Sequence, residues 1–161
     1  MPRTWTELAV VAAAAVLAVG LLGGFRSGPG RPELSPDRAS WVLTPGVANP
    51  DVTQETIGET ICKGGWTKTI RPPTDYTNAL KVEQMEAYRR SGSPSDYQED
   101  HLISLELGGH PTDPRNLWPQ PYPRASKVDG IENALNDDVC AGRLTLAEAQ
   151  RREADLKHQH G

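Results

Sequence analysis

The stretch Glu99-Asp-His-Leu-Ile-Ser-Leu-Glu-Leu-Gly-Gly-His-Pro-Thr-Asp-Pro-Arg-Asn-Leu-Trp-Pro-Gln-Pro121 decides how this chain of 161 residues folds. Alternating polar and apolar residues over 97–107 predict a strand, which the Gly108-Gly109 pair ends in a turn. The prolines that follow forbid a helix as far as about Arg124, so Asn116 is expected in a loop or a short strand. An apolar face spaced for a helix then covers 126–141. The predicted order is strand, turn, strand or loop, helix.

The segments on either side of this unit predict further helices, which makes the fold class α+β. Residues 51–62 predict a short helix, with Val52, Ile57 and Ile61 as buried positions. Residues 66–70 are expected to be extended, and 75–90 to form a helix. Thr145 and Glu148 match a capping box that opens a last helix. The tail 157–160, which contains His158 and His160, is expected to be frayed.

The first fifty residues are expected to lie outside this domain. The run Leu8–Phe25 carries no charge, and its length suits either an uncleaved membrane-anchoring helix or a cleaved signal peptide. Both alternatives stay open for residues 1–25. Residues 26–50 are rich in Pro and Gly and predict a flexible linker. The domain, 51–161, is therefore expected to be exported, either secreted or held at the cell envelope.

Export changes the meaning of the two cysteines, Cys62 and Cys140. In an oxidising compartment, two cysteines in one small domain usually pair. Neither has another cysteine or a histidine near it at the spacing of metal ligands, which disfavours a metal or nucleophile role. The sequence therefore predicts a disulfide that closes a long loop around the Asp-His motif.

The segment from Asp100 to Asn116 and the helix after it resemble the HNH, or ββα-metal, endonuclease motif, over roughly residues 98–140. The Glu-Asp-His, Leu-Glu-Leu-Gly-Gly and Asp-Pro-Arg-Asn-Leu-Trp-Pro sequences resemble its compact versions in small bacterial proteins. The resemblance implies a ββα-metal core in which His101 is the general base and Asp100 a metal ligand. It also implies that Asn116 fixes the loop and orients the histidine.

This combination suits phosphodiester hydrolysis. An imidazole with a pKa near 6.5 accepts a proton from water at neutral pH, while a divalent cation neutralises charge on the phosphoryl and leaving oxygens. Neighbours on an ideal strand point to opposite faces. A bulge or the end of the strand must therefore bring Asp100 and His101 to one site.

The chain departs from the family pattern on the helix, where a further metal ligand is usual. Nine residues after Asn116, where the family has a histidine or asparagine, this chain has Ala125. Asp129 and Glu132 are the best substitutes, since side chains three residues apart share a helix face. The two acids are also typical of a solvated helix N-terminus. With only oxygen ligands beside the base, Mg or Mn is expected in preference to Zn.

Charge complicates a role on nucleic acid, because the formal net charge is −4 and phosphates attract positive surfaces. Basic residues nevertheless outnumber acids between Cys62 and Arg90, either to contact a phosphate backbone or as an ordinary solvated face. The basic residues are Lys63, Lys68, Arg71, Lys81, Arg89 and Arg90. We therefore expect a metal-dependent endonuclease, acting on DNA in preference to RNA. The alternative is a non-catalytic envelope protein that binds through a degenerate ββα scaffold.

Overall fold

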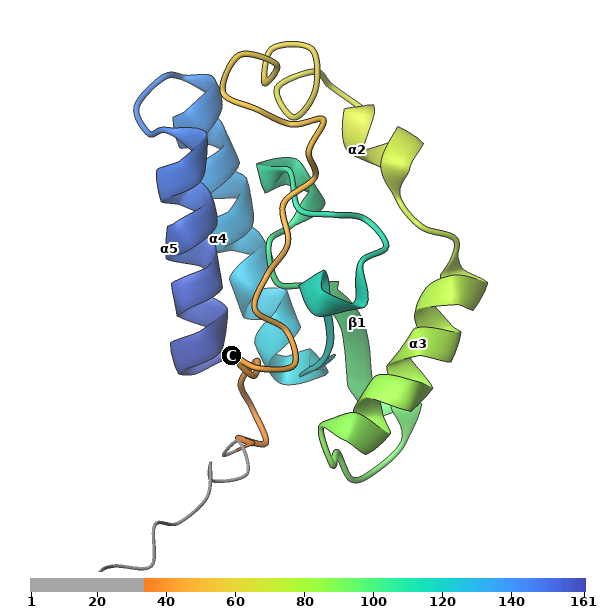
Figure 1. Ribbon diagram of the computed structural model, residues 1–161. Helices are drawn as coiled ribbons and strands as arrows, with labels where there is room; N and C mark the ends of the chain where they lie inside the picture. The colour runs from red at the N-terminus through yellow and green to blue at the C-terminus, as the bar shows by residue number, and fades with distance from the viewer. Residues whose placement is uncertain (1–33) are drawn as a thin grey trace, which may run out of the picture. The chain divides into compact units, whose positions relative to one another are not determined.

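The computed structural model describes residues 34–161, so the expected signal peptide or anchor and residues 26–33 of the expected linker lie outside the described part. The fold is α+β, with helices around a two-stranded sheet (Figure 1). Its elements are α2 (Trp66–Ile70), α3 (Thr74–Ala87), β1 (Tyr97–His101), β2 (Leu117–Pro121), α4 (Tyr122–Cys140) and α5 (Leu146–His160). In residues 34–161, no helix has both the length and the apolar character to cross a membrane.

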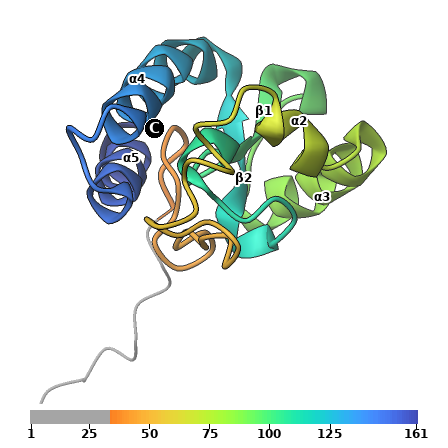
Figure 2. The ribbon, with the colours of Figure 1, turned by 90° about the horizontal axis from the view of Figure 1, so that it is seen from above.

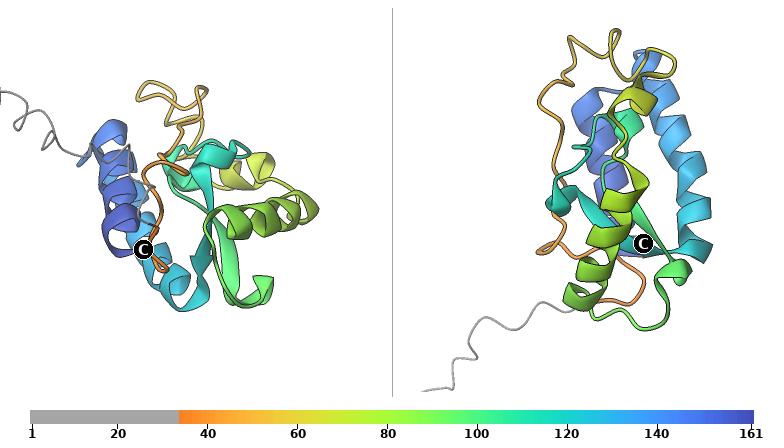
Figure 3. Two further views of the ribbon diagram at one scale, coloured as in Figure 1. Left: turned by 60° about the horizontal axis from the view of Figure 1, so that its bottom comes forward. Right: turned by 90° about the vertical axis from the view of Figure 1, so that its right-hand side faces the viewer.

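The two strands are antiparallel, with Tyr97 opposite Pro121 and His101 opposite Leu117. The first strand is shorter than the predicted 97–107, because a 3₁₀ turn over Leu105–Leu107 follows it. Prolines fit in β2 because a strand with one neighbour keeps a free edge, where no N–H is needed. The sheet lies between α3 on one side and the α4–α5 pair on the other (Figures 2 and 3).

The helix α4 begins at Tyr122, directly after β2 and earlier than predicted. Pro123 falls in its first turn, where a missing N–H is harmless. Three predicted positions, Val128, Leu135 and Val139, are buried, whereas Ile131 is 43% exposed. The helix α5 packs alongside α4 and opens as predicted, with the Thr145 hydroxyl accepting a hydrogen bond from the Glu148 N–H.

Residues 51–70 differ from the prediction. The expected helix over 51–62 is a series of turns, and the expected extended segment 66–70 is the helix α2. Gly65 precedes that helix with φ 84°, a left-handed conformation that glycine adopts without strain. Val52 and Ile61 are buried as predicted, because side chains in turns can also pack on a core.

The described part of the expected linker, residues 34–50, belongs to the folded unit. Ala39 and Thr44 are buried, and the Thr44 hydroxyl lies 2.7 Å from the hydroxyl of Tyr88. The Asn49 N–H donates to the carbonyl of Gly108 at 2.8 Å. A composition typical of linkers is compatible with order here because α3 and the 108–109 turn supply the partners.

The tail is also not frayed. The helix α5 continues to His160, and both Lys157 and His158 are buried. The His158 ring stacks on Trp41 with centroids 3.7 Å apart. Trp41 belongs to the segment whose composition predicts a linker, so the sequence alone does not indicate the contact that orders the tail.

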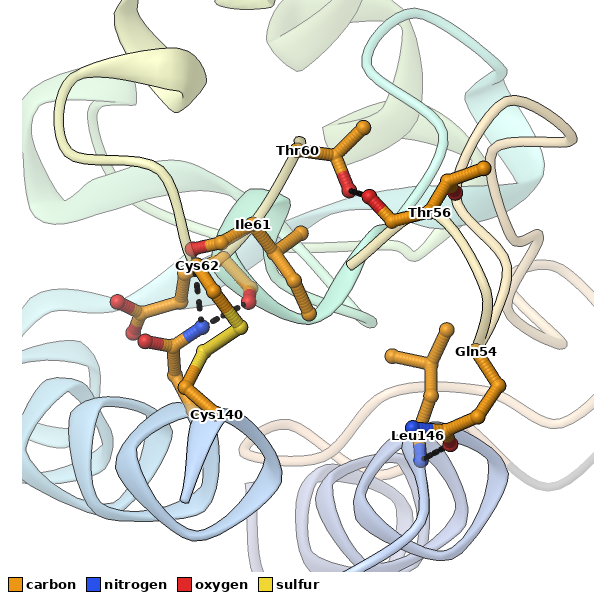
Figure 4. The surroundings of a disulfide bond; sticks show 9 residues. Gln54, Thr56, Thr60, Ile61, Cys62, Cys140 and Leu146 are labelled. Atoms are coloured by element: carbon orange, nitrogen blue, oxygen red, sulfur yellow. Dashed lines mark hydrogen bonds between the residues drawn. A yellow bond between two sulfur atoms is a disulfide. The ribbon is translucent and has the colours of Figure 1, made fainter. Parts of the chain in front are cut away.

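Cys62 and Cys140 form the expected disulfide, with Cα atoms 5.5 Å apart across 78 positions of sequence (Figure 4). It joins the turn segment to the end of α4. The Asn136 amide strengthens this junction by donating to the carbonyls of Glu106 at 2.6 Å and Ile61 at 3.4 Å. A crosslink of this kind typically stabilises a domain by about 2–4 kcal/mol.

Candidate functional site

A cavity of about 390 Å³ opens where β1 ends. Its walls come from the α2 region, from β1 and the 3₁₀ turn after it, and from α4. The lining includes four residues that the sequence singled out, Asp100, His101, Asp129 and Glu132, together with Thr67, Arg71, Gln98, Ser104, Leu105, Glu106 and Asn133. The structure therefore gathers these four in one cavity and leaves Asn116 outside its lining.

The end of the strand, not a bulge, brings Asp100 and His101 to the cavity. The pairing of β1 with β2 is continuous up to His101, the last residue of the strand. Both side chains line the same cavity. The position at the end of the strand therefore brings the two side chains together, and no bulge is needed.

The His101 ring is fixed by a backbone carbonyl. Its Nε2 lies 3.0 Å from the carbonyl oxygen of Pro111, and the side chain is buried. Because a carbonyl only accepts, Nε2 carries the proton and Nδ1 is left as the acceptor. Burial lowers the pKa of His101, and Lys157 and Arg71 lower it further, against the opposing effects of Pro111 and Asp100. The imidazole is therefore neutral at pH 7.

Asn116 is fully buried and clamps the loop between the strands. Its Oδ1 accepts from the Ile103 N–H at 3.0 Å and the Val47 N–H at 3.3 Å. Its Nδ2 donates to the carbonyls of Ile103 and His110, both at 3.0 Å. His110 immediately precedes Pro111, so the amide holds the segment whose carbonyl orients His101.

The close packing of this loop around the Asn116 amide requires glycine at position 109. A Cβ there would lie 1.7 Å from the carbonyl oxygen of Ile103 and 2.7 Å from Nδ2 of Asn116. Both distances are far below contact distance, and neither the backbone nor the clamped amide can move away. Gly109, the second glycine of the motif, therefore lets the loop close against Asn116.

Lys157, at the end of α5, is the site residue that the sequence reasoning missed. It is fully buried, and its Nζ lies 2.9 Å from Asp100 Oδ2, 2.6 Å from Glu132 Oε1 and 3.1 Å from Glu153 Oε1. It also donates to the carbonyl of His101 at 2.5 Å. Burial alone would lower the pKa of Lys157, but the three carboxylates outweigh it and raise that pKa well above its usual value.

A sequence signal for Lys157 did exist. Ala149, Glu153 and Lys157 follow one another at intervals of four on α5, and all three are buried. Side chains four residues apart lie on one face of a helix, so a face that begins with the apolar Ala149 also carries Glu153 and Lys157. The signal applies only when the helix continues as far as Lys157, which the expectation of a frayed tail does not allow.

The chemistry of the donor set fits a hard divalent cation. Four carboxylates line the cavity, from Asp100, Glu106, Asp129 and Glu132, against the positive charges of Lys157 and Arg71. Burial, and then the charges of Glu132 and Asp129, raise the pKa of Glu106 to about 7. An excess of carboxylate oxygens is the environment that Mg²⁺ and Mn²⁺ prefer.

The arrangement of these donors does not assemble a metal site. Asp100 and Glu132 are both engaged by Lys157. Within residues 34–161, no three Asp, Glu, His or Cys side chains are placed to hold a metal ion together. The cavity therefore contains carboxylates suited to a metal ion, but the ammonium of Lys157 already pairs with two of them, Asp100 and Glu132.

The basic residues before the motif divide by role. Lys81 donates to the Tyr97 carbonyl at 3.1 Å, and Arg90 to the Ser35 carbonyl at 2.6 Å, so both are structural. Arg71 is exposed and lines the cavity. Of the six, Arg71 is thus the one placed beside His101.

Comparisons of this chain with protein-family models, with curated proteins and with solved structures found no match. The function is therefore inferred from the geometry of the site. A neutral, oriented histidine, an acidic wall and an arginine share one cavity. A proton acceptor, carboxylate oxygens and a group that pairs with anions therefore lie in one cavity.

Glu99, next to Asp100, gives a prediction about pH. Both of its carboxylate oxygens are buried without a hydrogen-bond partner among the described residues. Burial raises its pKa to about 8; Lys81 lowers it and Asp100 raises it. A carboxyl whose pKa is higher in the folded state stabilises the fold at low pH, and this stability is lost as pH rises through about 4.5 to 8.

We therefore expect Glu99→Gln to raise the melting temperature by several degrees at pH 8 and to change it much less at pH 5. Thermal unfolding of the oxidised protein in EDTA, at both pH values, measures this difference. Glu86→Gln, at an exposed position on α3, is the control and should have no such effect. An equal shift at the two pH values would show that burial of the charge is not the cause.

Proposed function

We propose that this protein is a metal-dependent endonuclease of the HNH, or ββα-metal, type, which hydrolyses phosphodiester bonds of nucleic acid, DNA in preference to RNA. The observation that carries the proposal is the neutral His101, oriented through Nε2 at the wall of a cavity that it shares with Asp100, Asp129 and Glu132. The chain order β1, β2, α4, with β1 and α4 both contributing walls of that cavity, supports a ββα-metal core.

In this proposal His101 is the general base. Its Nδ1 takes the proton from the water that attacks the phosphorus, since Nε2 is committed to Pro111. The bond from phosphorus to the leaving oxygen breaks in the same displacement, and solvent water protonates that oxygen. Asn116 is a positioning residue, because it acts on His101 through the loop that carries Pro111. Arg71 contacts the phosphate oxygens and offsets the acidic wall.

Asp100, with Asp129 and Glu132, would hold Mg²⁺ or Mn²⁺ in preference to Zn²⁺, because all three offer only carboxylate oxygens. Such an ion, when bound, neutralises negative charge that develops on the phosphoryl group. The four carboxylates of the cavity and the raised pKa of Glu106 support this assignment.

Export is part of the same proposal, with residues 8–25 as the membrane anchor if that segment is not removed. The disulfide between Cys62 and Cys140 supports it. Disulfides form and persist in the oxidising compartments outside the cytoplasm. The nuclease would then act in the cell envelope or in the medium.

A second candidate function is binding without catalysis at the cell envelope. The contacts of Lys157 with Asp100 and Glu132 favour it, because a site whose proposed metal ligands are held by an internal cation resembles a degenerate one. The two candidates make opposite predictions about hydrolysis and can be separated with the unmodified protein.

The separating experiment is cleavage of supercoiled plasmid and of a structured RNA by the purified, disulfide-bonded protein. With Mn²⁺ or Mg²⁺ we expect nicked and linear plasmid, and cleavage of RNA at a lower rate than that of plasmid. With EDTA we expect no cleavage of plasmid or of RNA. Circular dichroism confirms that the protein is folded in each condition. A folded protein that retains plasmid on a filter and cuts neither substrate with any of Mg²⁺, Mn²⁺ or Zn²⁺ would establish the binding function instead.

A further inference from the structure

The ammonium of Lys157 bridges two carboxylates that come from different parts of the fold. Asp100 lies on β1 and Glu132 on α4, and Nζ is 2.9 Å and 2.6 Å from their nearest oxygens. These are two of the three residues proposed above to hold a metal ion. A cation at this point joins the end of the strand to the helix, as a bridging metal would.

We infer that Lys157 is an internal cation that competes with a divalent metal ion for Asp100 and Glu132. The inference rests on the metal-binding role given to those residues in the proposed function. The ammonium satisfies both carboxylates when no metal ion is bound, and its positive charge opposes the approach of a second cation. Lys157 therefore lowers the affinity of the cavity for a metal ion.

Lys157 cannot leave the site by turning toward solvent. Its side chain is fully buried, and it is also held by Glu153, one turn earlier on α5, and by the carbonyl of His101. Glu153 is itself fixed, because both its oxygens lie 3.0 Å from the Ser104 N–H. The ammonium thus keeps two anchors even when Asp100 and Glu132 turn toward a metal ion.

Removing the charge of Lys157 should therefore strengthen metal binding. Methionine approximates the length of lysine without its charge, so we expect Lys157→Met to bind Mn²⁺ at least tenfold more tightly than the wild type. Electron paramagnetic resonance of free Mn²⁺ during titration gives the dissociation constant without any nucleic acid. Lys127→Met removes the same charge from an exposed position on α4 and should change the constant less than twofold.

The single variant leaves Glu153 buried without its partner and could lose the fold for that reason. The double variant Lys157→Met with Glu153→Gln removes one charge of each sign, and the glutamine oxygen still accepts from Ser104. We expect it to be folded by circular dichroism and to show the same gain in Mn²⁺ affinity. Either folded variant with an affinity equal to or below that of the wild type would overturn the inference and make Lys157 a group that orients the ligands.

The outcome is independent of the nuclease assay. A protein that cuts no nucleic acid but gains Mn²⁺ affinity on loss of Lys157 would reject the proposed hydrolysis and retain the competition. If the wild type cuts plasmid but the folded Lys157 variants show no gain in Mn²⁺ affinity, the proposed hydrolysis is retained and the competition is rejected.

Discussion

Replacement of His101 by alanine is expected to reduce plasmid cleavage by about 10²–10⁴-fold, the usual contribution of a general base. The imidazole has one fixed nitrogen, because Nε2 lies 3.0 Å from the Pro111 carbonyl. The other nitrogen is the acceptor through which the proposed reaction removes a proton from water. Alanine leaves both the cavity and the acidic residues in place but provides no acceptor.

The loss is measured as the initial rate of nicking at saturating Mn²⁺. His160→Ala is the matched control, since His160 is an exposed histidine at the end of α5, and it should retain the wild-type rate. A His101→Ala variant that is folded and cuts at the wild-type rate would remove His101 from the mechanism.

The pH profile gives a second measure of the same role. Burial lowers the pKa of His101 below its usual 6.5, so the neutral base persists into mildly acid solution. We therefore expect the acid limb of the kcat/KM profile to fall below pH 6.5 and to be lost in the residual activity of His101→Ala. Circular dichroism across the same range excludes unfolding as the cause of the limb.

Much of the site could be predicted from sequence because it lies on a short, nearly continuous stretch. Asp100 and His101 end one strand, and Asn116 directly precedes the next. The strand β2 runs into α4 without a loop, which places Asp129 and Glu132 beside the end of β1. The spacing of residues along this stretch is therefore enough to predict that Asp129 and Glu132 lie near Asp100 and His101.

The parts that sequence did not predict depend on contacts between distant segments. Lys157 meets Asp100 across 57 positions, and His158 bonds to Ala39 across 119. Composition describes each segment without its partner. It therefore predicts a frayed tail at 157–160 and a flexible linker at 26–50, although His158 of the tail contacts Ala39 of that linker. The prediction of a helix over 51–62 is wrong in a different way. Val52 and Ile61 are buried as predicted, but the backbone between them forms turns, because the spacing of apolar residues indicates burial without fixing the backbone conformation.

Asn116→Ala is expected to lower the free energy of unfolding by about 3–5 kcal/mol, because it leaves buried polar groups without partners. Its amide makes four bonds, to the N–H and carbonyl of Ile103, the N–H of Val47 and the carbonyl of His110. Alanine satisfies none of them, and Asn116 is fully buried, so water cannot readily replace the amide.

Urea unfolding of the oxidised protein in EDTA measures this loss. Asn78→Ala, at an exposed position on α3, is the control and should change stability by less than about 0.5 kcal/mol. Asn116→Asp tests the two directions of the amide separately, because it keeps the acceptor for Ile103 and Val47 but places a carboxylate oxygen against the carbonyls of Ile103 and His110. We expect it to be nearly as unstable as the alanine variant. If aspartate restored full stability, the clamp would rest on the accepted bonds alone, and the carbonyl that orients His101 would not depend on Asn116.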